Sequence, residues 1–310
     1  MGKYADSPEW ADVVPISQQE HMPAPLAQIA YTDEYAEAMS YLRATMASNE
    51  LSERVLALTE DIIRLNPSHY TVWLYRFRTL SALPTASLTT ELTTFLNPLS
   101  LRHLKNYQIW HHRQLLVSAI GSYEGEAEFL VDMFAKDAKN YHVWSYRQWL
   151  VRHFKLFHSA SELAFTEQLI GEDVRNNSAW NHRWHVNFAD GDGLSDSGLV
   201  AKELEYAMGK IELAAQNESA WNYLRGLLAK GAGVEESKVV QFAVKYAGLD
   251  GGEVKSTHAL DLLASIYGKD PAKKESAVQA LELLADKYDP IRAPYWRYRL
   301  AMVNSGVAAS

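Results

Sequence analysis

The chain has 310 residues, a formal net charge of −8, nine tryptophans, seventeen tyrosines and no cysteine. The acidic balance disfavours nucleic acid as the main partner, and the lack of cysteine excludes disulfides, thiolate metal sites and thiol nucleophiles. We expect a soluble cytoplasmic protein, because the sequence shows neither a basic-then-apolar leader nor an apolar run of membrane-helix length.

Residues 1–31 contain four prolines and no helical period, which predicts an extended N-terminal arm. Part of this arm should lie on a folded surface, because it carries the apolar side chains of Trp10, Val13, Val14 and Ile16. From Thr32 onward, apolar residues at spacings of three and four predict an opening helix that ends near 48–49.

Helix pairs follow, and no segment alternates with a period of two over a useful length, so strands are not expected. In the first pair, Ser52 can cap one helix, Pro67 ends it, and the second helix carries Trp73. The later pairs are predicted at 87–96 and 107–119, 124–136 and 141–157, 161–173 and 178–189, 199–214 and 219–230, 235–247 and 257–267, and 273–287 and 295–304.

The second helices share a repeat. Its tryptophans are Trp73, Trp110, Trp144, Trp180, Trp221 and Trp296, which are 34 to 41 residues apart except for a last gap of about two periods. That gap leaves room for one copy without its tryptophan. Because each hairpin leaves an apolar face that a neighbour must cover, the sequence predicts an all-α array of about seven hairpins that curves into a superhelix. We expect one repeat domain over 32–310, after the arm of 1–31.

Two further positions of the repeat are nearly constant. An arginine stands three residues after most of the tryptophans, on the same helix face, where we expect the guanidinium to meet the indole and to reach the adjoining turn. An asparagine stands four residues before Trp110, Trp144, Trp180 and Trp221, where it can cap the helix. We interpret this Asn, Trp and Arg set as scaffold.

The positions that differ between copies are the better candidates for function. The early helix starts carry Tyr70, Lys105, Tyr107, Gln108 and, one repeat later, Lys139, Tyr141 and His142. A helix start offers free N–H groups and a positive dipole, so a cationic ledge with aromatic walls there suits a phosphate ester on an apolar group. From spacing alone, solvated loop lysines are the favoured alternative.

These stretches also carry a family resemblance. The segments KNYQIWHHR at 105–113, DAKNYHVW at 137–144, EWAD at 9–12, EDVRNNSAWN at 172–181 and NESAWNY at 217–223 closely resemble the α subunit shared by protein farnesyltransferase and protein geranylgeranyltransferase type I. The resemblance covers nearly the whole chain. It implies a right-handed, TPR-like α-α superhelix, crescent shaped, that wraps a barrel-shaped β subunit in an obligate heterodimer.

The resemblance assigns roles residue by residue. Lys105 matches the lysine that contacts the isoprenoid diphosphate and favours its departure, and Gln108 matches a residue that binds the carboxyl end of the target peptide. Tyr107 matches an aromatic beside the reacting isoprenoid, and Tyr70 one near the substrate channel. Asn140, Tyr141 and His142 match residues that face the diphosphate and the partner. Lys139 matches a position without a catalytic role, so we expect it to be a surface residue.

Cofactors and substrates follow from the same resemblance. The substrates would be farnesyl or geranylgeranyl diphosphate and proteins that end in a CaaX motif, such as Ras- and Rho-type GTPases, with no nucleic acid and no membrane insertion. Zinc would be bound by the β subunit and magnesium would accompany the diphosphate. His111 and His112 suggest a metal pair at first sight, but adjacent side chains on a helix point apart, so we expect both to pack in the core.

Departures from the family pattern are few. Tyr146 stands where the family often has histidine, and His69 where it often has asparagine, both at scaffold positions. Two other functions compete with the first. The α subunit of Rab geranylgeranyltransferase generally lacks a glutamine at the position of Gln108, and a non-catalytic helical-repeat adaptor has no need of Lys105, Tyr107 and Gln108 together.

Overall fold

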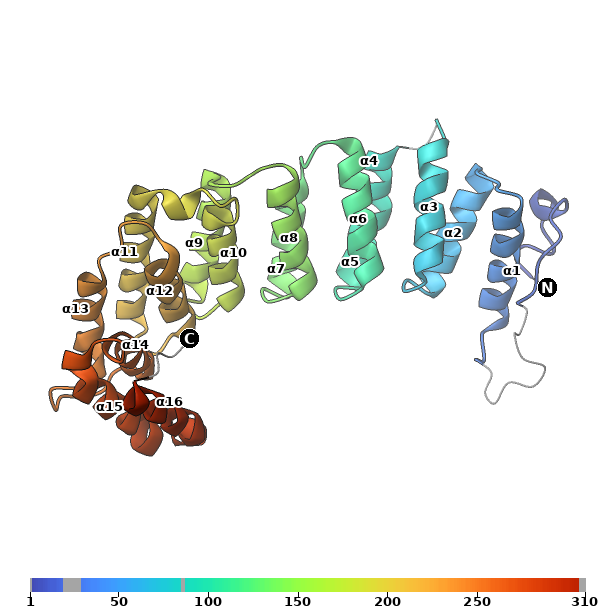
Figure 1. Ribbon diagram of the computed structural model, residues 1–310. Helices are drawn as coiled ribbons and strands as arrows, with labels where there is room; N and C mark the ends of the chain where they lie inside the picture. The colour runs from blue at the N-terminus through green and yellow to red at the C-terminus, as the bar shows by residue number, and fades with distance from the viewer. Residues whose placement is uncertain (1, 19–28, 85–86, 307–310) are drawn as a thin grey trace. The chain divides into compact units, whose positions relative to one another are not determined.

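The computed structural model describes residues 2–18, 29–84 and 87–306, and over these residues its regular structure is helical throughout (Figure 1). The all-α prediction is confirmed. The chain divides into two compact units, Met1–Leu150 and Val151–Ser310. The expected division into an arm over 1–31 and one domain over 32–310 stays a prediction.

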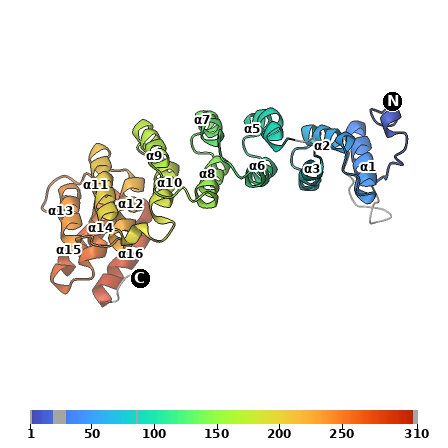
Figure 2. The same ribbon diagram turned by 90° about the horizontal axis from the view of Figure 1, so that it is seen from above.

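Unit 1 stacks its helices as successive hairpins. They form two layers when seen from above, with α2, α5 and α7 in one and α3, α6 and α8 in the other (Figure 2). The elements are η1 (Pro8–Trp10), α1 (Asp33–Ala47), α2 (Glu53–Leu65), α3 (Tyr70–Ala82), α4 (Leu88–Thr90), η2 (Glu91–Leu96), α5 (Asn97–Arg102), α6 (Tyr107–Ile120), α7 (Glu126–Lys136) and α8 (Tyr141–His153), whose last residues belong to unit 2.

Unit 2 continues the same pattern of paired helices. Its elements are α9 (Ala160–Glu172), α10 (Asn177–Phe188), η3 (Gly193–Ser195), α11 (Ser197–Leu213), α12 (Glu218–Lys230), α13 (Glu236–Ala247), α14 (Thr257–Tyr267), η4 (Pro271–Lys273), α15 (Lys274–Leu283), η5 (Leu284–Tyr288), η6 (Pro290–Arg292) and α16 (Ala293–Ser305). The predicted pairs are therefore present, most with ends displaced by only a few residues.

Two helix ends were predicted wrongly. The helix expected to stop at Leu96 continues into α5, because the wide π-helical turn η2 precedes Pro98 and accommodates a residue that has no N–H to give to an α-helical ladder. The helix expected to reach Phe157 ends at His153, and Lys155 and His158 take left-handed backbone angles, with φ of 55° and 59°, that interrupt the helix.

The N-terminal arm does lie on a folded surface, as expected. Trp10 is 5% exposed and meets Tyr41 of α1 edge-on, with ring centroids 5.5 Å apart. The Arg54 side chain covers Trp10 and forms an ion pair with Asp12 at 2.7 Å. Val14 and Ile16 are exposed, and the predicted arm also includes residues 1 and 19–28, which lie outside the described residues.

The asparagine caps are confirmed, and they also join neighbouring hairpins. The Asn106 Oδ1 accepts from the backbone N–H groups of Gln108 and Ile109, while its Nδ2 donates to the Pro67 carbonyl of the hairpin before, at 3.1 Å. Asn217 bonds in the same way to the Val174 carbonyl, at 2.7 Å. Asn106 and Asn217 therefore each fix a helix start against the loop of the preceding hairpin.

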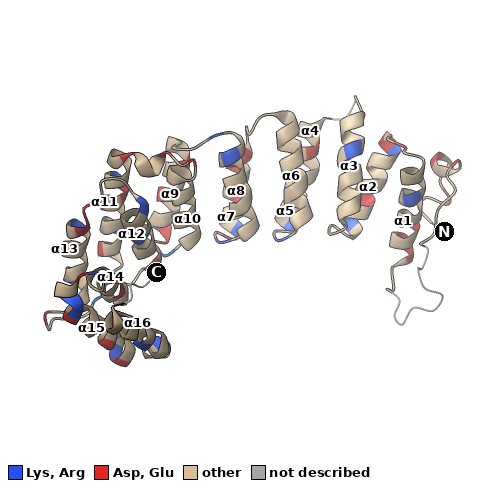
Figure 3. Cartoon of the chain, viewed as in Figure 1, with Lys and Arg blue, Asp and Glu red and all other residues tan. Residues whose placement is uncertain are grey.

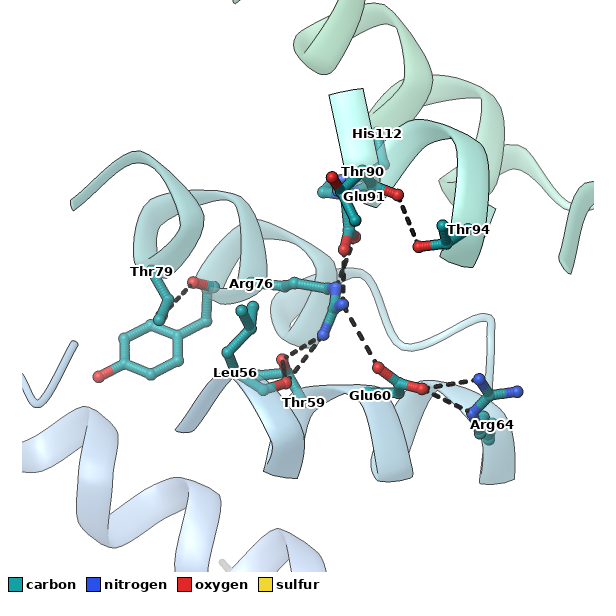
Figure 4. Close-up of polar contacts among 11 residues, drawn as sticks. Leu56, Thr59, Glu60, Arg64, Arg76, Thr79, Thr90, Glu91, Thr94 and His112 are labelled. Carbon is teal, nitrogen blue, oxygen red and sulfur yellow. Dashed lines mark hydrogen bonds and ion pairs between the residues drawn. The ribbon is translucent and has the colours of Figure 1, made fainter. Parts of the chain in front are cut away.

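Arg76, Arg113 and Arg183 lie over rings other than their own tryptophans, contrary to the prediction, whereas Arg299 lies over Trp296 as predicted. Arg76 instead forms a buried bidentate ion pair with Glu91 of the next hairpin, at 2.6 and 2.7 Å, and its guanidinium lies 4.2 Å from the Phe95 ring centroid (Figure 4). Burial explains the difference, because a guanidinium removed from water needs a carboxylate that an indole does not supply.

In several repeats the residue two places after the tryptophan completes this buried pairing, whereas Tyr75 donates to the Thr45 and Glu50 carbonyls and Tyr298 is exposed. The Tyr146 hydroxyl donates to Glu126, which also receives both hydrogen bonds of Arg113, and the Tyr223 hydroxyl donates to Glu203. His112 occupies the equivalent position and lies 3.1 Å from Glu91 through Nε2. Because tyrosine and neutral histidine both donate here, Tyr146 is a scaffold residue, as its sequence position suggested.

Candidate functional site

The candidate site lies at the starts of the second helices in unit 1. Tyr70, Tyr107 and Tyr141 are the first residues of α3, α6 and α8, and each is about 70% exposed. The loops that lead into these helices lie at the lower end of the unit in Figure 1, where Figure 3 shows lysine and arginine residues. Large exposed aromatic side chains at a helix start are available to a ligand or a partner.

Tyr107 and His142 are in direct contact across two hairpins. Their ring centroids are 4.4 Å apart, with the planes 88° apart, and His142 also meets Tyr141 edge-on at 5.5 Å. Partial burial and, next, the nearby Lys105 ammonium lower the pKa of His142. His142 is therefore a neutral imidazole at neutral pH, with one nitrogen that donates and one that accepts.

A small cavity of about 210 Å³ gathers three of the predicted residues, Tyr107, Tyr141 and His142. Its remaining lining comes from the same two helices and was not predicted; it consists of Trp110, His111, Gln114, Ser145 and Tyr146. Helical spacing from Tyr107 and Tyr141 predicts three of these lining residues. His111 and Gln114 follow Tyr107 on one face of α6, and Ser145 follows Tyr141 on one face of α8.

The expectation that His111 and His112 both pack in the core is confirmed for His112 and wrong for His111. His112 is 1% exposed, while His111 is exposed and lines the cavity. The reason is the one that argued against a metal pair, since neighbouring residues on a helix point in different directions.

Lys105 lines a separate, shallow depression of about 450 Å³ beside the start of α6. Arg102 and His103 line it as well, with Ser68, Leu104 and Asn106. Arg102 and Lys105 are exposed, and within the described part of the chain neither forms an ion pair. Because the positive end of the helix dipole adds to these charges, the depression can receive an anion.

The other predicted residues are placed differently. Tyr70 and Gln108 line neither cavity. Asn140 is 2% exposed, and its amide caps α8 through the His142 N–H and donates to the Leu104 carbonyl at 3.0 Å. Its side chain is therefore occupied by the scaffold, and its expected contact with substrate stays a prediction. Lys139 is exposed, as expected for a surface residue.

Two properties of the described residues bear on the chemistry. Over the residues 2–18, 29–84 and 87–306, no group of three or more His, Cys, Asp or Glu side chains could hold a metal ion. Among the helices of the described chain, none combines the length and the apolar character needed to cross a membrane.

Comparison with known proteins gives a consistent result. The model of the protein prenyltransferase alpha subunit repeat matches residues 52–83, 91–120, 123–154, 159–188 and 200–231, about half of the chain. The chain is 37% identical over 304 residues to the protein farnesyltransferase/geranylgeranyltransferase type-1 subunit alpha of Candida albicans, covering 96% of this chain and 98% of that one. It is 35% identical to the subunit of the same name from Dictyostelium discoideum, over 97% and 94% of the two chains.

A solved structure and a more distant relative complete the comparison. A chain of the Candida albicans protein geranylgeranyltransferase-I complexed with GGPP matches with a TM-score of 0.86 and 36% identity, over 94% of this chain and 97% of that chain. The geranylgeranyl transferase type-2 subunit alpha of Bos taurus is 31% identical over only 59% of this chain. On the repeats, the coverage and the shared helical architecture, this chain belongs to the protein prenyltransferase alpha subunit family.

Proposed function

We propose that this chain is the α subunit of a heterodimeric protein farnesyltransferase and geranylgeranyltransferase type I. With its β subunit it would transfer a prenyl group from the isoprenoid diphosphate to the cysteine thiol of a C-terminal CaaX motif. The observation that carries this proposal is the exposed Lys105, which forms no ion pair among the described residues. It lies at the start of α6, beside the Tyr107 and His142 pair, in a chain of this family.

Lys105 would act on the leaving group. As the carbon–oxygen bond to the diphosphate breaks and the carbon–sulfur bond forms, negative charge builds on the departing diphosphate. A cation fixed beside that group stabilises the transition state more than the ground state. The neighbouring Arg102 lines the same depression and would raise the local concentration of the anionic substrate.

Tyr107, Tyr141 and His142 would form an aromatic wall for the first isoprene units. Tyr107 and Tyr141 expose about two thirds of their surface, so they can bury apolar area against a prenyl chain without losing contacts inside the fold. A neutral His142 can donate a hydrogen bond to a diphosphate oxygen. Gln108 would bind the carboxyl end of the CaaX peptide, and Tyr70 would lie at the edge of the channel.

The metals are proposed for the partner and the substrate. The described residues of this chain do not fit a zinc site, so zinc would be held by the β subunit and magnesium would arrive with the diphosphate. We expect zinc assays to find about one ion in the heterodimer and close to background in this chain alone. Stoichiometric, tight zinc on the isolated chain would contradict this assignment.

The proposal is tested by reconstitution. The chain, expressed with a barrel-type prenyltransferase β subunit, should copurify as a one-to-one complex that buries well over roughly 2,000 Å², as obligate pairs do. This complex should prenylate CaaX peptides, and neither subunit should do so alone. A monodisperse monomer of this chain that transfers prenyl groups unaided would refute the heterodimer. Cell fractionation would test the proposed cytoplasmic location.

A further inference from the structure

A third cavity, of about 390 Å³, lies in unit 2 between α12, α14 and α16. Its charged lining residues are Arg225, Asp261, Lys269 and Arg299. Arg225 Nη2 lies 2.8 Å from Asp261 Oδ2, and Arg299 forms an ion pair with the other carboxylate oxygen of the same residue. Two guanidinium groups therefore share one carboxylate.

This arrangement departs from the scaffold of the earlier repeats. There Arg113 pairs with Glu126 and Arg183 with Glu203, each through two hydrogen bonds of 2.6 to 2.7 Å. In the cavity one carboxylate serves two arginines, and Lys269 adds a third positive charge. The lining therefore carries three positive charges and one negative charge, whereas each of the earlier pairs balances one arginine with one glutamate.

The two arginines also have hydrogen-bond donors left over. Arg225 Nη2 donates to the His258 carbonyl as well, and Arg299 Nη2 donates to Ser265. Within the described chain no acceptor pairs with Nε of either residue or with Nη1 of Arg225. The side chains are only 26% and 12% exposed, so water solvates these donors incompletely.

Electrostatics agree with this geometry. Burial lowers the pKa of Arg225, Asp261 opposes that shift, and the Arg299 guanidinium adds to it. Tyr295 and Tyr298 also line the cavity and are 50% and 62% exposed. Their hydroxyl groups can donate to the same ligand as the arginines.

We propose that this cavity is an oxyanion-binding site that takes one carboxylate or phosphate group between Arg225 and Arg299. Planar guanidinium groups bind such groups through paired, charge-assisted hydrogen bonds. The oxyanion has two sources, an acidic side chain of the partner subunit or a free phosphate group. The site lies in the other unit from Lys105, and it does not depend on prenyl transfer.

The first experiment titrates inorganic phosphate into the full-length chain by calorimetry. Arg225→Gln and Arg299→Gln should each weaken binding about tenfold or more, because each removes a charged donor. Asp261→Asn should strengthen binding, because it removes the competing carboxylate. Lys139→Ala, at an exposed lysine of the other unit that has no proposed role, is the control and should leave this binding unchanged.

The second experiment measures assembly with the β subunit, with the same variants. If the oxyanion belongs to the partner, Arg225→Gln and Arg299→Gln weaken assembly about tenfold or more and phosphate competes with it. If the ligand is a free anion, assembly is unchanged and phosphate stays bound in the complex. The proposal is overturned if neither phosphate binding nor assembly responds to the arginine variants, or if Asp261→Asn weakens phosphate binding. Tighter binding by Asp261→Asn is a gain that a misfolded variant does not produce.

Discussion

The Tyr107 ring stands edge-on against the His142 ring, with their centroids 4.4 Å apart, although 35 positions separate the two residues in the chain. The contact joins the starts of α6 and α8 and brings Lys105 close enough to lower the pKa of His142. One helix start thus supplies the cation and the next supplies the imidazole, so the candidate site is built from two repeats.

Lys105→Ala should lower the rate of prenyl transfer by about a hundredfold or more, because it removes one group that stabilises charge in the transition state. Affinity for the isoprenoid diphosphate should fall much less, and melting temperature and assembly should hardly change, since Lys105 is exposed. Single-turnover kinetics separates these effects. Lys139→Ala, the matched change one repeat later, should be nearly silent, and equal rates for the two variants would show that Lys105 has no such role.

The Lys105→Ala change should also raise the pKa of His142. A positive neighbour disfavours the imidazolium form, so its removal makes His142 easier to protonate. An NMR titration of the histidine ring protons in wild type and variant measures the shift directly. Lys139→Ala serves again as the control, and a His142 pKa that does not respond to loss of Lys105 would contradict the proximity seen in the fold.

Glu91→Gln should destabilise unit 1 by about 3–5 kcal/mol, because it removes the buried carboxylate that binds the Arg76 guanidinium through two hydrogen bonds. Arg64→Gln, which breaks the exposed pair with Glu60 and leaves Glu60 beside Arg76, should cost only about 0–1 kcal/mol (Figure 4). Urea unfolding of the two variants provides the comparison. Equal losses would mean that burial does not govern these pairs.

The effect of Glu91 should depend on pH. Burial opposes its ionisation, but hydrogen bonds from His112 and Arg76 hold its pKa below the ordinary value of 4.5. Its contribution is therefore present above pH 4.5 and is lost as the pH falls through the lowered pKa of the folded state. The difference in unfolding free energy between wild type and Glu91→Gln should shrink over that range. A difference that grows on acidification would contradict the lowered pKa of Glu91.

A scaffold residue and a site residue should respond differently to truncation, as Trp110→Ala and Tyr107→Ala can show. Trp110 is 5% exposed, and its loss should cost about 3–5 kcal/mol through lost packing and a cavity. Tyr107 is 68% exposed, so its loss should leave thermal unfolding nearly unchanged while weakening binding of the isoprenoid diphosphate. Calorimetric melting and ligand titration of both variants are the measurements. A large stability loss for Tyr107→Ala would place that residue in the scaffold.

The fold could be predicted from local pattern because each hairpin repeats the same signals. Apolar spacing marked the helices, Asn106 marked a helix start, and Trp110 marked the period. The partner of Arg76 could not be predicted in this way, because Glu91 lies in the next hairpin and nothing in the local sequence pairs the two. The sequence therefore predicts the helices, but not which side chains of neighbouring hairpins pair with one another.

The candidate site was predicted in part for the same reason. Lys105, Tyr107, Tyr141 and His142 were singled out because they differ between repeats at equivalent helix starts and because the family resemblance matches them to site positions. The fold places the last three around one cavity and Lys105 near His142. His111, which lines the same cavity, was missed because its neighbour His112 is a core residue and the two were treated alike. The crowding of arginines around Asp261 was not foreseen, since it depends on how α12, α14 and α16 pack.

The side-chain amide of Asn106 affects how folding propagates from one hairpin to the next. Its oxygen holds the first turn of α6, and its nitrogen holds the Pro67 carbonyl of the hairpin before. A helix start that is anchored to its predecessor nucleates more readily when that predecessor is already formed, because the anchor reduces the freedom that nucleation must remove. Folding should therefore propagate from hairpin to neighbouring hairpin, and Asn106→Ala should weaken this cooperativity and broaden the unfolding transition of unit 1.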